Sequence, residues 1–578
     1  MPFLFLPQVA PPTEPTALFT AQRFADVAEQ AAPGKLKIRA LMRLDRWEQA
    51  QAEAELLVLQ APNDADSWGL LALTRLRGGQ PEAAQKAVET AKKLGATSYW
   101  SLLAQATLLT VWDDKDKAAN VLVKKAVAQR PNEPEGWWLA LQTAETDADA
   151  RPALVALKRL QPKGHPFDEF AGDYDVLLKS MTAMRESKQT MEHNKRQIVF
   201  PPTARIPIQQ AMGMVFVTVT INGVPLKLLF DTGAGTGLLV DRNRTPELHA
   251  TFLTKTVIRG VQGKDESRML RPNSVALGAV KFGPLPLRES PDTPYCDGIF
   301  GGSLLMEYAV TLDFANSEMV LKRGKTFQPT DKKAYTLPFK QLFGGNLYVP
   351  IRLNAPPLGE GQKAGWFVDA PFWAIIDSGA QTGLISRRLA SALSLGLPDG
   401  MVRTIENNMP VGIGTSKASI TMDLVQRPFS LLGPGGLSHP VRFGVGASPL
   451  DGVISPGTGF ETGALLGMPF LSRYKRVTFD YPNKRLILEG APPSELATTD
   501  TDGIRNPTRV PNSDLPEGKH WIFGSDSGWL QVSSNFAPKG TPTTLPLTIA
   551  PGYRAIRLDK STWVLVPSTT PESAAQPK

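Results

Sequence analysis

The sequence has almost no cysteine and little histidine. Cys296 is the only cysteine among 578 residues, which excludes an intramolecular disulfide and a metal site built from several thiolates. The five histidines lie far apart and show none of the short spacings typical of metal ligands. They are His165, His193, His249, His439 and His520. We therefore expect no metal and no cofactor.

Long apolar runs are also missing. No stretch approaches the roughly 18 consecutive apolar residues of a membrane-spanning helix, so we expect no integral membrane segment. The start of the chain, MPFLFLP, lacks the basic region and the full apolar region of a signal peptide. Several prolines follow, and they predict a disordered lead-in over residues 1–20.

Charge of one sign is in only modest excess. The chain carries 63 basic and 55 acidic residues, a formal net charge of +8 at pH 7. Basic residues form no block and do not alternate with aromatic ones, so we expect no nucleic-acid partner. Proline and glycine, with 50 and 49 copies, exceed average use. This composition favours many short strands and turns over a helical bundle.

The first third of the chain nevertheless has a helical pattern. Residues 21–180 are rich in Ala, Leu, Gln, Glu and Lys, with apolar residues at three- and four-residue spacing. Small residues recur 34 positions apart at Ala50, Ala84 and Ala118. This spacing resembles the tetratricopeptide repeat, whose helix pairs stack into a solenoid with a concave face for a peptide or a partner protein. The alternative is an irregular helical domain.

Past residue 205 the apolar period changes to two, which predicts β-strands. Two matching phrases lie 146 residues apart in this part of the chain. DTGAGTGL begins at Asp231 and DSGAQTGL begins at Asp377, and the two are identical at six of eight positions. Each follows an apolar run that reads as a strand, Val224–Phe230 in the first case and Phe372–Ile376 in the second. The first run is preceded by another strand and an Asn222-Gly223 turn, which predicts a hairpin.

A second pair of matching phrases lies downstream. VTLDFANSEMVL begins at Val310 and VTFDYPNKRLIL begins at Val477, and each reads as strand, turn, strand. Shortly before each phrase comes a step of two apolar residues and a glycine, which ends on Gly301 or on Gly467. Two similar β-rich halves of one duplicated unit are therefore predicted.

This order of motifs, given twice, resembles the retropepsin-like aspartic proteases in a single-chain, two-lobed arrangement over about residues 205–490. The resemblance implies an aspartic endopeptidase in which Asp231 and Asp377 form the catalytic pair. It implies that Gly301 and Gly467 pack behind the active-site loops. It also implies supporting roles within those loops for Thr232, Gly233, Ala234, Ser378, Gly379 and Ala380.

The family also carries a hairpin flap in each lobe that closes over the substrate. Candidate flaps are Ile258–Lys264, with Gly260 and Gly263, and Pro410–Ser416, with Gly412 and Gly414. Neither segment contains the flap tyrosine of pepsins, so the resemblance is closer to the retroviral and bacterial members.

The chemistry of peptide hydrolysis explains why two aspartates are needed. One group must activate a water, and another must protonate the oxygen and nitrogen of the amide. Two carboxyl groups about 3 Å apart cannot both ionise, so they share one proton and supply base and acid together. A third Asp-Ser-Gly, at Asp526, follows Gly524 rather than an apolar strand, and we interpret it as a turn.

The predicted fold class is multidomain, with α-helical repeats, an all-β acid-protease fold of two lobes and a small C-terminal β segment. The predicted segments are a lead-in (1–20), helical repeats (21–180), a linker (181–205), lobe one (206–328), lobe two (329–490), a linker (491–520), a small β module (521–568) and a disordered tail (569–578).

Three functional hypotheses remain open from the sequence. The first is an aspartic endopeptidase whose helical repeats recruit a protein substrate or partner. The second is a non-catalytic peptide-binding or scaffold protein with an inactive protease-like cleft. The third is a self-processing enzyme that cuts linkers such as residues 185–205. The family resemblance and the low cysteine count favour a bacterial protein exported to the periplasm or envelope, with the cytoplasm as the alternative.

Overall fold

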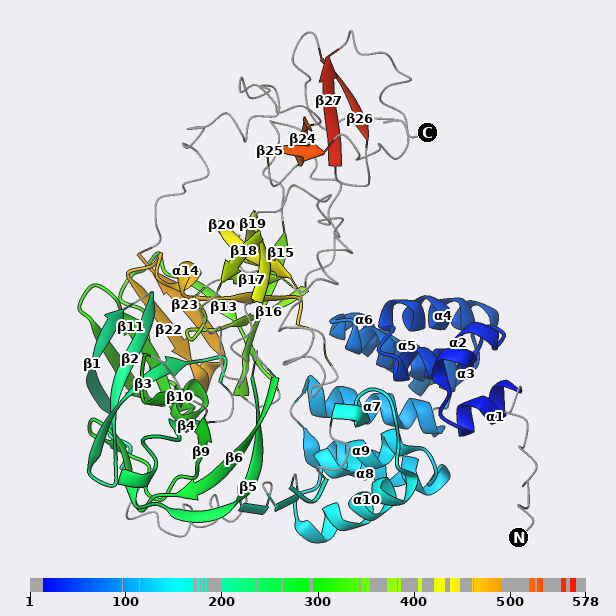
Figure 1. The fold of residues 1–578 in the computed structure, drawn as a ribbon, viewed down its shortest axis with the longest axis horizontal. Helices are drawn as coiled ribbons and strands as arrows, with labels where there is room; N and C mark the ends of the chain where they lie inside the picture. The colour runs from blue at the N-terminus through cyan, green and yellow to red at the C-terminus, as the bar shows by residue number, and fades with distance from the viewer. Residues whose placement is uncertain are drawn as a thin grey trace, which may run out of the picture. The chain divides into compact units, whose positions relative to one another are not determined.

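The computed structural model describes residues 14–169, 174–183 and 199–353 with short internal gaps, residues 372–385 and 460–490 with single gaps, and isolated strands elsewhere. The chain forms two compact units. A helical unit comprises Met1–Thr182 with Ser455–Glu461, and a β unit comprises Ala183–Ile454 with Thr462–Lys578. The predicted order, a helical part followed by a large β part, is confirmed (Figure 1).

The helical unit consists of short helices joined by tight turns. They are α1 (Pro15–Thr20), α2 (Phe24–Gln30), α3 (Lys35–Arg43), α4 (Trp47–Gln60), α5 (Ala65–Arg77), α6 (Pro81–Lys93), α7 (Tyr99–Val111), α8 (Asp116–Gln129), α9 (Pro134–Gln142) and α10 (Asp147–Leu160). The lead-in expected over residues 1–20 is already helical from Pro15. Pro15 begins α1, where a proline costs no hydrogen bond, and Leu18 is buried.

Close helix crossings depend on glycine more than on the predicted alanines. Ala50 and Ala84 are buried as expected, but Ala118 is exposed and its neighbour Ala119 is buried instead. One residue turns a helix by about 100°, so this shift moves the small side chain to the packed face. The tightest contact is at Gly69 in α5, where an added Cβ would lie 2.5 Å from the carbonyl carbon of Trp100 in α7.

One local structure occurs twice in this unit. The indole nitrogen of Trp68 donates a hydrogen bond to the carbonyl of Pro62 at 2.8 Å, and that of Trp137 donates to Pro131 at 2.8 Å. Both tryptophans lie in the first turn of a helix that follows a Pro-Asn turn. The unit therefore contains internal repetition at the entries to α5 and α9.

The first half of the β unit, called the first β half, contains β1 to β12. These are β1 (Thr203–Ala211), β2 (Met214–Ile221), β3 (Val224–Asp231), β4 (Leu238–Asp241), β5 (Thr251–Gly260), β6 (Gly263–Arg271), β7 (Val275–Leu277), β8 (Val280–Lys281), β9 (Leu287–Ser290), β10 (Gly298–Gly301), β11 (Tyr308–Asp313) and β12 (Glu318–Arg323). The predicted hairpin is present as β2 and β3, and Asn222 and Gly223 both have the positive φ that a tight two-residue turn requires.

Among the described residues, the second β half contains β13 to β23 and the short helix α14. These elements are β13 (Tyr335–Pro338), β14 (Lys340–Gln341), β15 (Leu347–Leu353), β16 (Phe372–Ile376), β17 (Gly383–Ile385), β18 (Thr404–Asn407), β19 (Ile420–Leu431), β20 (Leu437–Gly446), β21 (Ala464–Leu466), α14 (Met468–Leu471), β22 (Arg476–Asp480) and β23 (Arg485–Glu489). Residues 354–371, between β15 and β16, lie outside the described residues.

The two halves are joined by the matching downstream phrases. Each phrase forms a hairpin, β11–β12 in the first half and β22–β23 in the second, and β11 pairs antiparallel with β22. Thr311 lies opposite Thr478, the same position of the other phrase, and their hydroxyls hydrogen bond at 2.8 Å. Equivalent residues meet each other only across a local two-fold axis, so the duplication is expressed as approximate symmetry.

One apolar core runs through both halves. It includes Phe230 and Phe300 from the first half and Leu466 and Phe479 from the second, all fully buried. Further along the chain, β24 (Lys519–Gly524), β25 (Gly528–Ser533), β26 (Tyr553–Arg557) and β27 (Thr562–Pro567) form a separate four-stranded sheet. Gly524 of β24 pairs with Gly528 of β25, and Asp526, the aspartate of the third Asp-Ser-Gly, lies outside the described residues.

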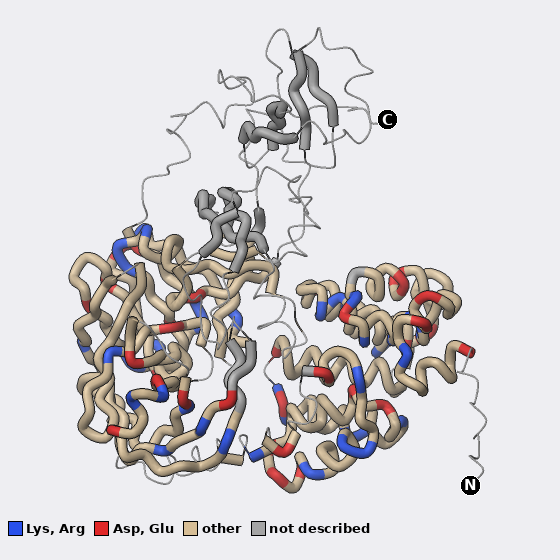
Figure 2. Tube along the Cα trace, viewed as in Figure 1, with Lys and Arg blue, Asp and Glu red and all other residues tan. Residues whose placement is uncertain are grey.

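Charges of both signs are spread over the described parts of both units (Figure 2). Among the described helices, none combines the length and the apolar character needed to cross a membrane.

The glycine crossing gives a test of the helical packing. Gly→Ala in a helix normally stabilises it by about 1 kcal/mol. We expect Gly69→Ala to destabilise the helical unit instead, because backbone atoms of α7 occupy the space. Gly136→Ala is the matched control, since its added Cβ would meet side-chain atoms of Val127 and Tyr99, which can move. Thermal unfolding of the full chain should rank Gly69→Ala below Gly136→Ala, and the reverse order would contradict this packing.

Candidate functional site

Asp231 and Asp377 each stand at the end of a strand within the β unit. Asp231 ends β3, which is paired in parallel with β10, so that Asp231 lies opposite Gly301. Asp377 follows β16, which is paired in parallel with β21, and its amide donates to the carbonyl of Leu466 at 3.0 Å. Parallel neighbours end at the same edge of the sheet, so each apolar-apolar-Gly step lies beside its aspartate loop.

Gly301 and Gly467 hold the loops from behind, as the family resemblance implied. A Cβ at Gly301 would lie 2.4 Å from the carbonyl oxygen of Ala234, and the Gly301 amide donates to Gly237 at 2.6 Å. In the second half the amide of Met468, directly after Gly467, donates to the carbonyl of Ala380 at 2.8 Å. Backbone therefore packs on backbone behind both loops.

Thr232 and Ser378 lock the two loops to each other. The amide of Thr232 donates to the Ser378 hydroxyl, and the amide of Ser378 donates to the Thr232 hydroxyl, both at 3.0 Å. Each hydroxyl in turn donates across to the other half at 2.8 Å, Thr232 to the carbonyl of Ile376 and Ser378 to that of Phe230. All four bonds are buried, where loss of one partner leaves a costly unpaired group.

Each carboxyl group accepts hydrogen bonds from its own loop. Oδ1 of Asp231 accepts from the amides of Gly233 at 2.7 Å and Ala234 at 2.9 Å. Oδ1 of Asp377 accepts from Gly379 at 2.8 Å, and the Ala380 amide also bonds to this side chain. These donors fix one oxygen of each carboxyl and leave the other free for its partner.

The glycines bring the two carboxyls together. A Cβ added at Gly233 would lie 2.5 Å from Cγ of Asp377, and one added at Gly379 would lie 2.4 Å from Cγ of Asp231. Any side chain at either glycine would therefore occupy the place of the opposite carboxyl. The structure thus brings together all eight residues that the sequence grouped around the pair, from Asp231 to Ala234 and from Asp377 to Ala380.

The proton affinities of the two carboxyls are raised unequally. Burial raises the pKa of Asp231, while the hydrogen bond from Asp377 and those from Gly233 and Ala234 act in the opposite direction. Burial and then the charge of Asp231 raise the pKa of Asp377 well above its ordinary value. One proton is therefore shared between the two groups, and the pair titrates as a unit.

The candidate flaps are described only in part. In the first candidate segment, Gly260 at the end of β5 pairs with Gly263 at the start of β6. Gly412 and Gly414 lie outside the described residues.

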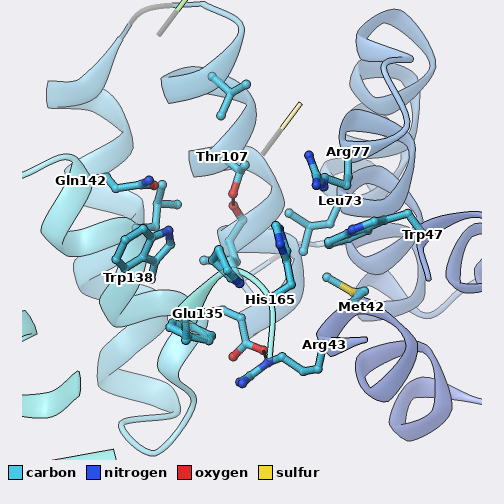
Figure 3. A pocket seen from close by; sticks show the side chains of 15 residues that line it. Met42, Arg43, Trp47, Leu73, Arg77, Thr107, Glu135, Trp138, Gln142 and His165 are labelled. Carbon is cyan, nitrogen blue, oxygen red and sulfur yellow. Dashed lines mark hydrogen bonds and ion pairs between the residues drawn. The ribbon is translucent and has the colours of Figure 1, made fainter. Parts of the chain in front are cut away.

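A second site, not expected from the sequence, is a cavity of about 110 Å³ within the helical unit. Trp138 and Gln142 of α9 lie on one side of His165 in Figure 3, and Trp47 and Met42 lie on the other. Burial, followed by the charge of Arg77, lowers the pKa of His165 to about 3, so its imidazole is neutral at pH 7. The walls of this cavity, called the tryptophan pocket, are therefore mainly apolar.

Ion pairs join α3 to the start of α9 beside the tryptophan pocket. Arg43 of α3 pairs with Glu135 of α9 at 3.0 Å, and Arg39 pairs with Glu133. The segment after α10 returns to α3, since the amide of His165 donates to the carbonyl of Arg43 at 2.9 Å. The sequence could not reveal this closure, because the paired residues are more than 90 positions apart.

The raised pKa of Asp377 predicts a pH-dependent effect on stability. A carboxyl whose folded pKa is raised stabilises the fold below its ordinary pKa of 3.8, and this stability is lost as the pH rises above that value. We expect Asp377→Asn to unfold like the wild type at pH 3 and at a higher temperature at pH 7. The gain should be about 1.4 kcal/mol for each unit by which the pKa is raised. Calorimetry of the β-unit transition measures this gain, and an equal gain at both pH values would contradict the prediction.

Solved structures that resemble the chain include proteases. The aspartic proteinase from Irpex lacteus is 13% identical, with a TM-score of 0.33, over 52% of this chain and 100% of that chain. The retropepsin-like aspartic protease from Rickettsia conorii is 18% identical, with a TM-score of 0.17, over 21% and 89%. Basic 7S globulin from soybean is 10% identical, with a TM-score of 0.28, over 51% and 99%. At TM-scores this low, these likenesses carry no conclusion about this chain.

The sequence of the first β half also matches a protein family. No curated protein matches the chain. Residues 217–304 match the family model described as aspartyl protease. The matched range begins in β2, contains Asp231 and Gly301 and ends before Asp377. The match supports an aspartic protease domain in this part of the chain.

Proposed function

We propose that the β unit is an aspartic endopeptidase that hydrolyses peptide bonds with a water activated by Asp231 and Asp377. The observation that carries this proposal is the mutual placement of the two carboxyls, each lying against the glycine of the other's loop. A shared proton on such a pair supplies a base and an acid at one place, which is the requirement of amide hydrolysis without a metal or a covalent nucleophile.

The unequal proton affinities assign different roles to the pair. Asp231, whose pKa is raised less, is the base that takes a proton from the water. Asp377, which retains the shared proton, donates it to the carbonyl oxygen of the substrate. The water oxygen then bonds to the carbonyl carbon, which gives a tetrahedral intermediate with two hydroxyl groups. The C–N bond breaks as the amide nitrogen receives the proton taken up by Asp231, and one hydroxyl of the intermediate returns its proton to Asp377. Thr232 and Ser378 position the loops during these steps.

Cleavage of an unfolded protein across pH 3 to 8 tests the proposal. We expect Asp231→Asn and Asp377→Asn each to lose activity by at least about 1,000-fold, because neither acid–base partner works alone. Pepstatin should inhibit the wild type. Thermal unfolding of both variants provides the control for folding. Equal activity of the wild type and both variants would contradict the proposal. Release of fragments of the protein itself that end within residues 185–205 would favour self-processing.

We further propose that the tryptophan pocket recruits an apolar side chain of a protein substrate or partner. Support comes from Phe460, which belongs to the helical unit although it lies about 300 residues from it in sequence. Its ring is fully buried and stacks on Trp112 at 5.8 Å. Trp112 directly follows Val111, which lines the tryptophan pocket. The helical unit therefore already accommodates one aromatic side chain from outside its described helices.

Filling the tryptophan pocket tests this recruiting role. Thr107 is a half-buried residue of the lining, and its hydroxyl donates to the carbonyl of Leu103 at 2.8 Å. We expect Thr107→Leu to weaken binding of a fluorescein-labelled casein digest to Asp231→Asn protein by about tenfold, because the added carbons occupy the cavity. Thr90→Leu in α6 is the matched control, since Thr90 is also half-buried and makes the same kind of bond but does not line the tryptophan pocket.

The same measurement separates the enzyme from a scaffold. Binding that depends on Thr107, in a protein that cleaves nothing, would favour the non-catalytic peptide-binding alternative. Equal binding by Thr107→Leu and Thr90→Leu would contradict the recruiting role.

A further inference from the structure

Tyr481 carries a buried hydroxyl that the fold does not explain. It begins the turn at Tyr481–Asn483 that directly follows β22, and it is 4% exposed. Its ring packs edge-on against Phe339 at 5.9 Å. Among the residues that the structure describes, its hydroxyl oxygen has no hydrogen-bond partner. A buried phenol without a partner costs about 1–3 kcal/mol relative to a paired one, and phenylalanine would fill the same space without that cost.

The hydroxyl lies directly behind the Asp231 loop. A Cβ added at Gly302 would be 2.4 Å from the Tyr481 hydroxyl oxygen and 3.0 Å from Cγ2 of Thr232. Gly302 therefore lies against both the phenol oxygen and Thr232, the residue that follows Asp231. Any larger residue at position 302 would displace the hydroxyl.

This oxygen breaks the symmetry of the pair. Tyr481 belongs to the phrase VTFDYPN, and the matching phrase of the first half, VTLDFAN, has Phe314 at the same position. The two halves otherwise meet through equivalent residues, such as Thr311 with Thr478 and Thr232 with Ser378. Phenylalanine has no hydroxyl, so only one of the two positions supplies this polar atom.

We propose that Tyr481 is a positioning residue, which favours the ionised form of Asp231 and thereby keeps the shared proton on Asp377. This inference rests on the proposed function. The hydrogen of a phenol hydroxyl lies close to the ring plane and can take either of two directions, and without an acceptor nearby the direction toward negative charge is favoured. The hydroxyl dipole then stabilises an anion on the Asp231 side of the pair and gives Asp377 no matching benefit.

Asp231 is the charged group with which the Tyr481 hydroxyl interacts. Burial and then the charge of Asp231 raise the pKa of Tyr481, so the phenol stays neutral and remains a donor. The neighbouring carboxylate, Asp480, is bound by Arg485 at 2.7 Å and by the side chain of Asn483 at 2.8 Å. Asp377 is the remaining partner, and it shares its proton with Asp231.

The pH profile of cleavage by Tyr481→Phe tests the proposal. Removal of a dipole that stabilises the anion makes the first ionisation of the pair harder, so the acidic limb should move to higher pH by roughly half a unit. Activity on that limb should fall about threefold, while activity on the plateau stays unchanged. The unfolding temperature should stay the same or rise, because the lost hydroxyl has no partner among the described residues.

Tyr308→Phe is the matched control. Tyr308 is equally buried, lies in β11, and donates its hydroxyl to the carbonyl of Pro201 at 3.1 Å. This variant should lose stability without moving the acidic limb. An unchanged limb in Tyr481→Phe, or an equal shift in both variants, would overturn the proposal.

A second readout separates failure of this inference from failure of the proposed function. Carbon-13 NMR of labelled aspartate carboxyls reports ionisation whether or not the protein cleaves peptides, and the Asn variants assign the two signals. An inactive protein whose Asp231 signal titrates at higher pH in Tyr481→Phe would support the positioning role and contradict the endopeptidase. If the Asp231 signal titrates identically in the wild type and in Tyr481→Phe while the protein cleaves peptides, the endopeptidase is supported and the positioning role is contradicted.

Discussion

The reciprocal hydrogen bonding of Thr232 and Ser378 is the constraint on which the site depends. Each residue uses its amide and its hydroxyl to bind the other loop, so neither loop is satisfied alone. Because these groups are buried, any separation of the loops would leave several polar groups unpaired at once. The two carboxyls belong to the loops that these hydrogen bonds hold together. Backbone and hydroxyl groups therefore set the distance between the carboxyls, against their mutual repulsion.

Duplication gives the β unit an approximate two-fold symmetry, and small sequence differences between the halves make the two sides of the carboxyl pair unequal. The β11–β22 pairing and the loop interlock both join equivalent residues across a local two-fold axis. A strictly symmetric pair would hold its proton equally on both sides. The halves differ in sequence, however, and Tyr481 in the second half stands where the first half has Phe314.

The sequence predicted those features that depend on residues close together in the chain. The β2–β3 hairpin followed from alternation and an Asn-Gly turn, and the grouping around Asp231 and Asp377 followed from two eight-residue phrases. It missed features that depend on distant residues, such as the ion pairs of α3 with α9 and the approach of Tyr481 to Gly302. It also chose Ala118 where Ala119 is buried, because a repeat length does not fix which face a helix turns inward.

Gly233 and Gly379 have a consequence for how such a chain can change. The space that each glycine leaves empty is filled by the carboxyl of the other half, so the two loops share a single volume. The two halves differ in sequence elsewhere, but both keep the aspartate and the glycine at this point. A side chain at either glycine could not be accommodated by changes within the same half. The other half would have to lose its aspartate.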